Sequence, residues 1–399
     1  MQKHKPALDG GTPVRDTFLP FYRAPIDDED IECVAETLRS GWLTVGPKTE
    51  EFEAAIESYL GVKHAIVLSS CSEAMFLALK ALGVGPGDEV ITSALTFAST
   101  VHAIIHTGAI PVLTDIEEET FGPSPAEIKK RITHRTKAIM PVHFGGQACR
   151  IDDICAIADE KSLAVVEDAA HGFGAAYKGV KVGAFGDATA FSFYATKNLT
   201  TGEGGCLTVQ DERFESKLRC LLYHGMSRDS WERYTDRGSW SYKVEVPGYK
   251  CNLNDILSSL GLSQLRKVDK QLERRAEVAH KYMMHLQTSP IFELPKVRDG
   301  NLHTWHLFVV RLNLEKLTVD RDHFTKALAA ENIGCSVHFI PVYVHPFFVP
   351  YKSSNDRFPA CEDYFSRCIS LPIYPGMEDG DVQDVVEALN KVASYYTKL

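Results

Sequence analysis

Asp168 and Lys197 each stand just beyond an apolar run of the sequence. The run Leu163–Val166 leads into Asp168, and the run Ala188–Phe193 ends shortly before Lys197, which a glycine-rich turn follows. Short apolar runs bounded by turn signals are typical of buried strands. Groups just past the ends of such strands face the ligand crevice of an open α/β sheet. We therefore expect the two side chains to face one site.

An acid and a lysine that face one site suit the chemistry of pyridoxal phosphate. The aldehyde of this cofactor condenses with a lysine amine, and its pyridine nitrogen needs an acidic partner so that the ring can act as an electron sink. In this interpretation Lys197 receives the aldehyde and Asp168 faces the nitrogen. The spacing alone leaves an alternative open, in which a surface lysine follows a core strand and the aspartate caps a helix.

Two longer motifs resemble a known family. Residues 168–174 (DAAHGFG) and 191–205 (FSFYATKNLTTGEGG) are similar to the central motifs of the DegT/StrS-like nucleotide-sugar aminotransferases, a branch of the fold-type I pyridoxal-phosphate enzymes. The resemblance runs from SGWLTVGP (40–47) to SLPIYPGM (370–377). It implies an α/β fold like that of aspartate aminotransferase. We expect a large, mostly parallel α/β/α sheet domain that binds the cofactor in residues 1–260, and a linking helix with a small C-terminal α/β domain in residues 261–399.

The elements needed to position such a site are visible in the hydrophobic pattern. Strands and helices alternate in the first half of the chain, which predicts a mostly parallel sheet covered on both faces. The strands are expected at His64–Ser69, Glu89–Thr92, Ala109–Asp115 and Lys137–His143, and the helices at Asp27–Ser40, Glu73–Leu82, Ser124–Arg131 and Cys149–Lys161. In the C-terminal part the pattern predicts strands at His303–Leu312 and Gly334–Phe339 and helices at Arg321–Glu331 and Asp381–Tyr396.

The composition of the chain indicates which partners and which cellular compartment to expect. The chain has 399 residues, is 44% hydrophobic and carries a formal net charge of −10, without a Lys/Arg-rich run. We therefore expect neither nucleic acid nor a membrane as partner. Its ten cysteines form no CxxC pair, and no signal peptide or long apolar run is present, so we expect a cytoplasmic protein with reduced thiols. His102 and His106 have the i, i+4 spacing of a metal pair but lack the glutamate of HExxH, so no metal is expected.

The resemblance assigns two places to the cofactor phosphate. Cys71 and Ser72 lie between a predicted strand and a predicted helix, an arrangement that points free backbone N–H groups and the helix dipole at an anion. Ser72 is also the expected N-cap of that helix, and capping alone is the alternative role. Ser192 matches a family serine on the phosphate. Because Ser192 and Phe193 alternate faces in a strand, only one of them can point into the site.

Three further residues are assigned to the cofactor by resemblance. Phe97 matches an aromatic that stacks on the pyridine ring, although an aromatic side chain is otherwise typical of a core. His171 stands where the family places a hydrogen-bond donor beside the phenolic oxygen of the ring. Asn252 matches an asparagine that reaches the cofactor phosphate of the neighbouring subunit, which implies a homodimer with a shared active site.

Substrate contacts are predicted at Trp42, Thr44 and His338. The first two lie in a glycine-bracketed loop that is near the substrate in the family; the alternative is a packed connector. His338 matches a family histidine near the substrate; the alternative is a histidine satisfied within the core.

The resemblance implies a transaminase that takes an amino group from an amino acid, expected to be L-glutamate, and leaves pyridoxamine phosphate as the intermediate form. The segments EDAAH, GYKCNLND, WHLFVVRL and SVHF are most similar to the branch that acts at C4 of UDP-linked 4-keto sugars, including the enzyme that makes UDP-4-amino-4-deoxy-L-arabinose. The expected product is a UDP-4-amino sugar for polysaccharide or glycan biosynthesis. Two alternatives stay open: an enzyme for a 3-keto sugar linked to dTDP or UDP, and a catalytically silent regulatory homologue, against which the presence of Lys197 and Asp168 argues.

Overall fold

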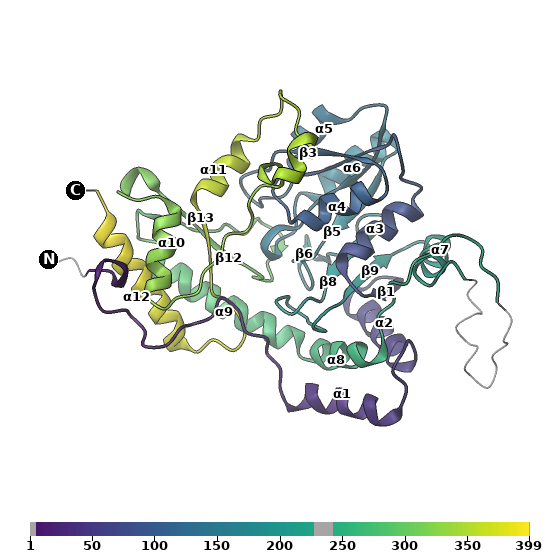
Figure 1. Ribbon diagram of the computed structural model, residues 1–399, viewed down its shortest axis with the longest axis horizontal. Helices are drawn as coiled ribbons and strands as arrows, with labels where there is room; N and C mark the ends of the chain where they lie inside the picture. Colours follow the sequence, from purple (N-terminus) through teal and green to yellow (C-terminus); the bar gives the residue numbers. More distant parts are fainter. Residues whose placement is uncertain (1–4, 227–241, 399) are drawn as a thin grey trace.

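A seven-stranded sheet organises the larger part of the molecule. The computed structural model describes residues 5–226 and 242–398, and the sheet has the strand order β1-β9-β8-β5-β4-β2-β3 (Figure 1). Only β9 runs antiparallel to its neighbours, and all the other pairs are parallel. The strands are β1 (His64–Leu68), β2 (Glu89–Ser93), β3 (Ile110–Thr114), β4 (Thr136–Met140), β5 (Ala164–Asp168), β8 (Ala188–Ser192) and β9 (Gly205–Val209). The sequence predicted this mostly parallel sheet.

Helices cover both faces of this sheet. On one face, side chains such as Val67, Ile139 and Val165 pack in a core cluster with four helices: α2 (Pro47–Leu60), α5 (Pro125–Arg131), α6 (Ile151–Lys161) and α8 (Asp255–Arg266). On the other face, side chains such as Ile66 and Val166 pack in a second cluster with α3 (Cys71–Ala81), α4 (Ala98–His106) and α7 (Glu212–Leu222). Neighbouring residues of one strand therefore enter different cores, as the alternation of side chains in a strand requires. This is the α/β/α arrangement of fold-type I enzymes. The sequence analysis did not predict α2.

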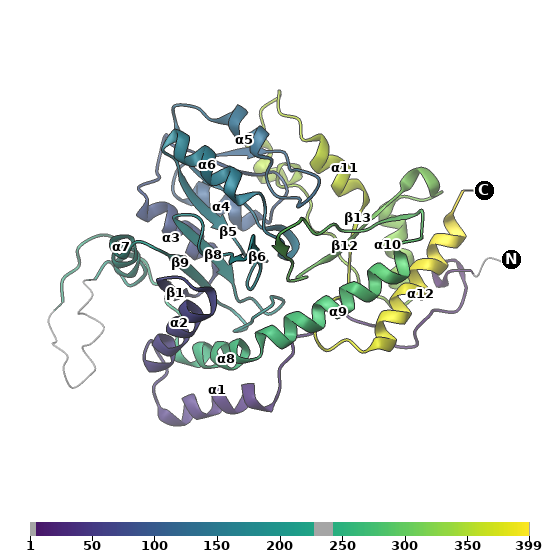
Figure 2. The ribbon, with the colours of Figure 1, turned by 180° about the vertical axis from the view of Figure 1, so that it is seen from behind.

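A smaller antiparallel sheet forms the centre of the C-terminal part. It contains β10 (Phe292–Glu293), β12 (Phe308–Leu312) and β13 (Cys368–Leu371) in that order. Its core also includes side chains of α9 (Val268–Leu286), α10 (Arg321–Ala330) and α12 (Asp379–Tyr396). The helices α8 and α9 run in succession from the large sheet to this part (Figure 2). The predicted division after residue 260 falls within α8 and stays a prediction.

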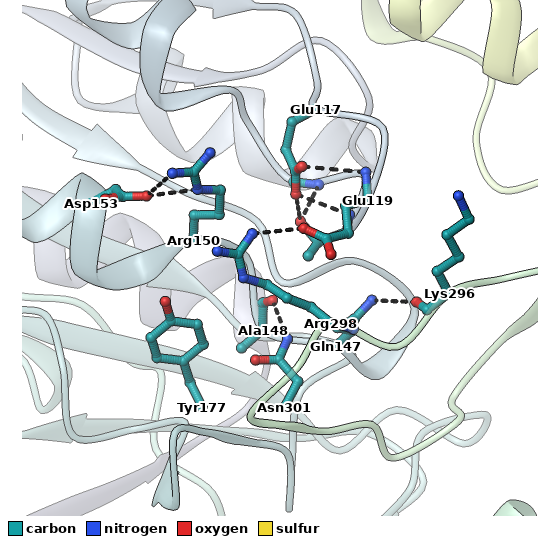
Figure 3. Close-up of polar contacts among 12 residues, drawn as sticks. Glu117, Glu119, Gln147, Ala148, Arg150, Asp153, Tyr177, Lys296, Arg298 and Asn301 are labelled. Carbon is teal, nitrogen blue, oxygen red and sulfur yellow. Dashed lines mark hydrogen bonds and ion pairs between the residues drawn. The ribbon is translucent and has the colours of Figure 1, made fainter.

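One segment returns from the C-terminal part to the large sheet. We call residues 296–307 the strap. The side-chain amide of Gln147 donates to the Lys296 carbonyl at 3.1 Å and accepts from the Arg298 amide at 2.7 Å (Figure 3). The Arg298 guanidinium pairs with Glu119 at 2.7 Å, and Asn301 donates to a backbone carbonyl beside Gln147 at 2.9 Å. These contacts fix the strap on the large sheet's side of the molecule.

Pairing between two short strands extends this attachment. Within the strap, β11 (Asn301–Leu302) pairs with β6 (Ala176–Tyr177), which in turn pairs with β7 (Val180–Lys181). This pairing places the strap residues that follow β11 near the carboxyl ends of the central strands.

The strap also explains why the strand predicted at His303–Leu312 is wrong over its first half. The amides of Thr304 and Leu307 donate to the carbonyls of Gly146 and Gly145 at 2.9 and 3.0 Å, and Trp305 between them has φ 52°. Because these amides are bonded to the large part of the molecule, regular pairing begins only at Phe308.

The hydrophobic pattern also predicts a strand that the structure does not form and a loop that is mostly not described. The strand predicted at Gly334–Phe339 is reduced to one isolated bridge between Ser336 and Ser370. Residues 223–240 are polar and aromatic without clear periodicity, which predicts an extended loop, and most of them lie outside the described residues. No helix in the described part of the chain is long and apolar enough to cross a membrane.

The helix predicted at Asp27–Ser40 is α1 (Asp28–Ser40), and the stripe expected from its helical period, Ile31, Val34 and Leu38, is largely exposed. Ile31 and Leu38 are 59% and 51% exposed, whereas Asp30 is buried and accepts a hydrogen bond from Gln264 of α8 at 2.8 Å. The packed face of α1 is therefore partly polar. The described part of the chain leaves the apolar face largely uncovered.

Candidate active site

A cavity of about 540 Å³ lies at the carboxyl ends of the central strands. The strap and the segments around Phe21 and Phe339 close its other side. Eight of the residues predicted from the sequence line this one cavity: Cys71, Ser72, Phe97, Asp168, His171, Ser192, Lys197 and His338.

Lys197 follows β8 in the chain and lines the cavity. Burial lowers the pKa of its amine to about 8, while the nearby Cys71 and Asp168 act in the opposite direction. A lysine amine is a nucleophile only when it has lost its proton, and burial is a common means of making this form available near neutral pH. Lys197 can therefore condense with an aldehyde under ordinary conditions.

Asp168 is the last residue of β5 and is fixed by its neighbours. Its backbone amide donates to the Pro141 carbonyl at 2.8 Å, and its carbonyl accepts from His143 at 3.0 Å. One carboxylate oxygen, Oδ2, accepts from the Thr100 hydroxyl at 2.7 Å, and Oδ1 accepts from the Ala170 amide at 3.1 Å. A carboxylate has about four acceptor positions, so Asp168 retains capacity for the N–H of a protonated pyridine ring.

The N-terminus of α3 forms a cradle for an anion, but its cap differs from the prediction. Ser70, not Ser72, is the N-cap: its hydroxyl accepts from the Glu73 amide at 3.1 Å. The predicted cap is wrong because the serine three residues before Glu73 has the spacing that the bond requires. Cys71 and Ser72 are thus the first helical residues, whose N–H groups have no acceptor within the helix.

Gly205 of β9 lies directly against this helix start. A Cβ atom at Gly205 would lie 2.5 Å from the Cys71 amide nitrogen, so only glycine permits the close approach. Ser192, at the end of the adjacent β8, also lines the cavity, whereas Phe193 is in the core, as their alternation predicted. The helix start and the serine fit a phosphate group.

His171 is buried beside these groups with a defined tautomer. Its Nδ1 accepts from the Gly145 amide at 3.2 Å. Burial lowers the pKa of His171 well below its usual value, and Lys197 adds to the effect, so the ring is neutral and carries its proton on Nε2. A neutral histidine with that tautomer is a hydrogen-bond donor, as the phenolic oxygen of the cofactor requires.

Phe97 presents an aromatic face to the cavity instead of entering the core. It directly precedes α4, is 60% exposed, and its ring centroid lies 5.8 Å from that of Phe339. That exposure argues against the core alternative and leaves a face of the ring available for stacking on a planar group.

His338 is held from two sides. Its Nδ1 lies 2.9 Å from the Ser370 hydroxyl, and its ring stacks on Phe21 at 5.5 Å. Burial, with Lys197 adding to the effect, lowers the pKa of His338 to about 4, so the ring is neutral near pH 7.

Three predicted residues do not line the cavity of their own chain. The Trp42 indole donates to the Val45 carbonyl at 2.9 Å, and the Thr44 carbonyl accepts from Asp255 at 3.0 Å. Asn252 lines a second cavity, of about 300 Å³, and donates to the Leu253 carbonyl. Their roles toward substrate and cofactor stay predictions.

Sequence reasoning missed several cavity residues, among them Tyr22 and His306. The Tyr22 hydroxyl donates to the Lys197 carbonyl at 3.4 Å. His306 belongs to the strap, and its ring centroid lies 4.4 Å from that of His171. Burial lowers the pKa of His306 well below its usual value. No periodic pattern marks either residue, because long-range contacts of irregular segments bring both to the site.

The sequence of this chain matches a known family and its members. The model of the DegT/DnrJ/EryC1/StrS aminotransferase family matches residues 24–390. Over 382 residues the chain is 50% identical to the spore coat polysaccharide biosynthesis protein SpsC of Bacillus subtilis, covering 95% of this chain and 98% of that protein.

Solved structures show the same likeness. The pyridoxal-phosphate form of the putative sugar aminotransferase Spr1654 from Streptococcus pneumoniae superimposes with a TM-score of 0.88 at 32% identity, covering 95% of this chain and 99% of that one. Helicobacter pylori PseC, an aminotransferase involved in the biosynthesis of pseudoaminic acid, gives a TM-score of 0.87 at 28% identity, covering 96% of this chain and 100% of that one.

Proposed function

Because the chain belongs to the DegT/DnrJ/EryC1/StrS aminotransferase family and is a pyridoxal-phosphate-dependent sugar aminotransferase, we propose that its substrate is a UDP-linked 4-keto sugar. In this proposal L-glutamate donates the amino group, the cofactor alternates with pyridoxamine phosphate, and the product is a UDP-4-amino sugar for polysaccharide biosynthesis. The observation that carries the proposal is the meeting of Lys197, Asp168 and the start of α3 in one cavity.

The residues of the cavity divide the binding of the cofactor among them. The start of α3 and Ser192 would hold the phosphate, and Asp168 would accept a hydrogen bond from the protonated ring nitrogen. Phe97 would pack on the ring, while His171 would donate to its phenolic oxygen. When bound, pyridoxal phosphate supplies an electron sink that makes the Cα–H bond of an amino acid acidic.

Lys197 provides the proton chemistry. Its amine would hold the aldehyde of the cofactor, and Nζ, once released, would take the proton from Cα of the amino donor. With a pKa of about 8, the amine is close to the range in which a group acts as both base and acid near neutral pH. The same nitrogen returns a proton when the sugar ketone is the acceptor.

Two observations support a sugar as acceptor. Besides the groups assigned to the cofactor, the lining of the cavity includes the aromatic side chains of Phe21 and Phe339 and the neutral His338. Apolar faces and a neutral hydrogen-bonding ring suit the alternating apolar and hydroxyl surfaces of a sugar better than a carboxylate. The name of the SpsC relative, spore coat polysaccharide biosynthesis protein, places that protein in polysaccharide formation.

We also propose a homodimer in which Asn252, Trp42 and Thr44 serve the site of the partner subunit. Among the residues described, Lys197 is the one lysine or arginine that lines the cavity. The diphosphate of a nucleotide sugar is negatively charged, so its binding would need groups from outside this lining, which a second copy of the chain could supply. The exposed apolar face of α1 supplies surface for an interface between copies.

We propose the cytoplasm as the compartment of the protein. All ten cysteines are unpaired, which supports a reducing environment.

The proposal is tested by product analysis. The protein is incubated with pyridoxal phosphate, L-glutamate and, separately, UDP- and dTDP-linked 4-keto and 3-keto sugars, and NMR locates the amine in the product. We expect the amine on C4 of a UDP-linked sugar and none with Lys197→Ala. An amine on C3 would replace the proposal by the 3-keto alternative. Absence of any product, with no exchange of label between glutamate and oxoglutarate, would favour the silent homologue.

A further inference from the structure

Two buried hydroxyl groups connect the cavity wall with Asp168. Thr96 lines the cavity, and Thr100 lies behind it in the first turn of α4. Their Oγ1 atoms are 2.6 Å apart, and Thr100 Oγ1 is 2.7 Å from Asp168 Oδ2. Thr96 is 2% exposed and Thr100 is fully buried. The three side chains therefore form a continuous chain of hydrogen bonds shielded from solvent.

The direction of this chain follows from the number of hydrogens. A threonine hydroxyl donates one hydrogen bond, whereas an ionised carboxylate only accepts. The hydroxyl of Thr100 donates to Asp168, so in its contact with Thr96 it must accept. The hydroxyl of Thr96 consequently donates to Thr100, and both hydrogens point toward the carboxylate.

The helix α4 links this chain to the proposed ring-stacking residue. Phe97 directly precedes the helix, and its carbonyl accepts from the Thr100 amide at 3.2 Å. The aromatic side chain and the hydroxyl that contacts Asp168 are thus fixed in one helical turn. A threonine inside a helix commonly bonds the carbonyl four residues earlier, but Thr100 contacts a side chain 68 positions away in the sequence.

We propose that Thr100, supported by Thr96, is a positioning residue that fixes the carboxylate of Asp168 against the pyridine nitrogen of the cofactor. Thr100 occupies Oδ2 while the Ala170 amide occupies Oδ1, so the carboxylate has one orientation. Because Phe97 and Thr100 share a turn, the ring-stacking side chain and the acid keep a constant relative position. The inference rests on the proposed role of Asp168 and extends it to the residues behind that side chain.

The experiment follows the bound cofactor by its absorbance as the pH is varied, which reports the protonation of the lysine-linked cofactor without any substrate. The variants are Thr100→Val, which keeps the shape and removes the hydroxyl, Thr100→Ser, which restores it, and Thr96→Val. The matched control is Thr92→Val, because Thr92 is equally buried but donates to the Met140 carbonyl. Asp168→Asn serves as the reference, because it shows in which direction the midpoint of the titration moves when the acid itself is lost.

We expect Thr100→Val to shift the midpoint of the titration in the same direction as Asp168→Asn, by about one pH unit or less, and to weaken cofactor binding about tenfold. Thr100→Ser and Thr92→Val titrate as the wild type, and Thr96→Val gives a smaller shift of the same sign. If Thr100→Val does not fold, the shift in Thr96→Val carries the test, and its absence overturns the inference.

The failure of this inference is distinguishable from that of the proposed function. A shift with Asp168→Asn and none with Thr100→Val contradicts the positioning role alone. Wild-type titration with Asp168→Asn contradicts the role of Asp168, and with it the inference.

Discussion

The two walls of the cavity are built in different ways. One wall, which we call the sheet wall, consists of the ends of β5 and β8 and the start of α3, and it includes Asp168 and Ser192. Its backbone is fixed by the hydrogen bonds of the central sheet. The other wall, the strap wall, comprises Tyr22, His306 and His338 from segments without regular structure.

This difference in construction suits two different tasks, the binding of one cofactor and the selection among several substrates. A regular sheet holds its groups with little freedom, as the binding of a rigid planar cofactor requires. Irregular segments lie outside the central sheet and can differ in sequence without disturbing it, as the recognition of different sugars requires. We therefore assign the cofactor to the sheet wall and the selection of substrate to the strap wall. The predictions below test this division.

The largest effect is expected at the acid of the sheet wall. Asp168→Asn removes the charge opposite the ring nitrogen, and we expect the rate of the first half-reaction to fall by about 10²–10³-fold. Single-turnover absorbance measurements with the amino donor determine this rate. Asp152→Asn, on the surface near Tyr177, is the control. A fall of less than about threefold would contradict the assigned role.

A smaller effect is expected at the phosphate cradle. Gly205→Ala places a Cβ atom 2.5 Å from the Cys71 amide nitrogen, which must displace the start of α3. We expect the dissociation constant of pyridoxal phosphate to rise by about 10- to 100-fold, equivalent to one or two lost hydrogen bonds to a charged group. Gly380→Ala, where a Cβ atom would meet no neighbour, should leave it unchanged. Equal affinities for the two variants would place the phosphate elsewhere.

The pH dependence of cofactor capture tests the ionisation of Lys197. Only the neutral amine reacts with the aldehyde, and burial lowers its pKa to about 8. The rate of capture should therefore rise about tenfold per pH unit below pH 8 and become constant above it. Stopped-flow absorbance measures this rate. A rise that continues to pH 10 would indicate an ordinary lysine.

On the strap wall the effect should be confined to the sugar. His338→Phe keeps the stacking on Phe21 but removes the ring nitrogens. We expect KM for the keto sugar to rise about tenfold, with unchanged affinity for pyridoxal phosphate. The control is His345→Phe, which does not alter the cavity lining. Loss of cofactor affinity in His338→Phe would contradict the division between the walls.

The smallest effect is expected in the attachment of the strap. Gln147→Ala removes the bonds to the Lys296 carbonyl and the Arg298 amide (Figure 3). We expect the free energy of unfolding to fall by about 1–3 kcal/mol. Arg298→Ala breaks a partly exposed ion pair with Glu119 and should cost about 1 kcal/mol or less. Denaturant unfolding measures both, and a larger loss in Arg298→Ala would reverse this ranking.

The same two walls explain which parts of the site the sequence could predict. The sheet wall follows from local pattern, because short apolar runs end at Asp168 and precede Lys197. The strap wall depends on contacts between distant segments, such as the bond from Thr304 to Gly146. Such contacts leave no periodic signal, and His306 was therefore missed even though His338 was found by resemblance.

The wrong strand boundary near His303 and the exposed apolar stripe of α1 have related causes. The run that begins at His303 is apolar and aromatic like a strand, but its first amides are bonded to Gly145 and Gly146 outside the small sheet. The stripe of α1 was recognised from its helical period, yet the period cannot show whether an apolar face meets its own chain or another one.

The central claim, that Lys197 holds the cofactor at the sheet wall, is tested most directly by chemical trapping. The protein loaded with pyridoxal phosphate is reduced with borohydride, which makes the lysine linkage permanent, and the labelled peptide is identified by mass spectrometry. We predict one label, on Lys197, and no label at any position in Lys197→Ala. A label on a different lysine, or none in the wild type, would contradict the account.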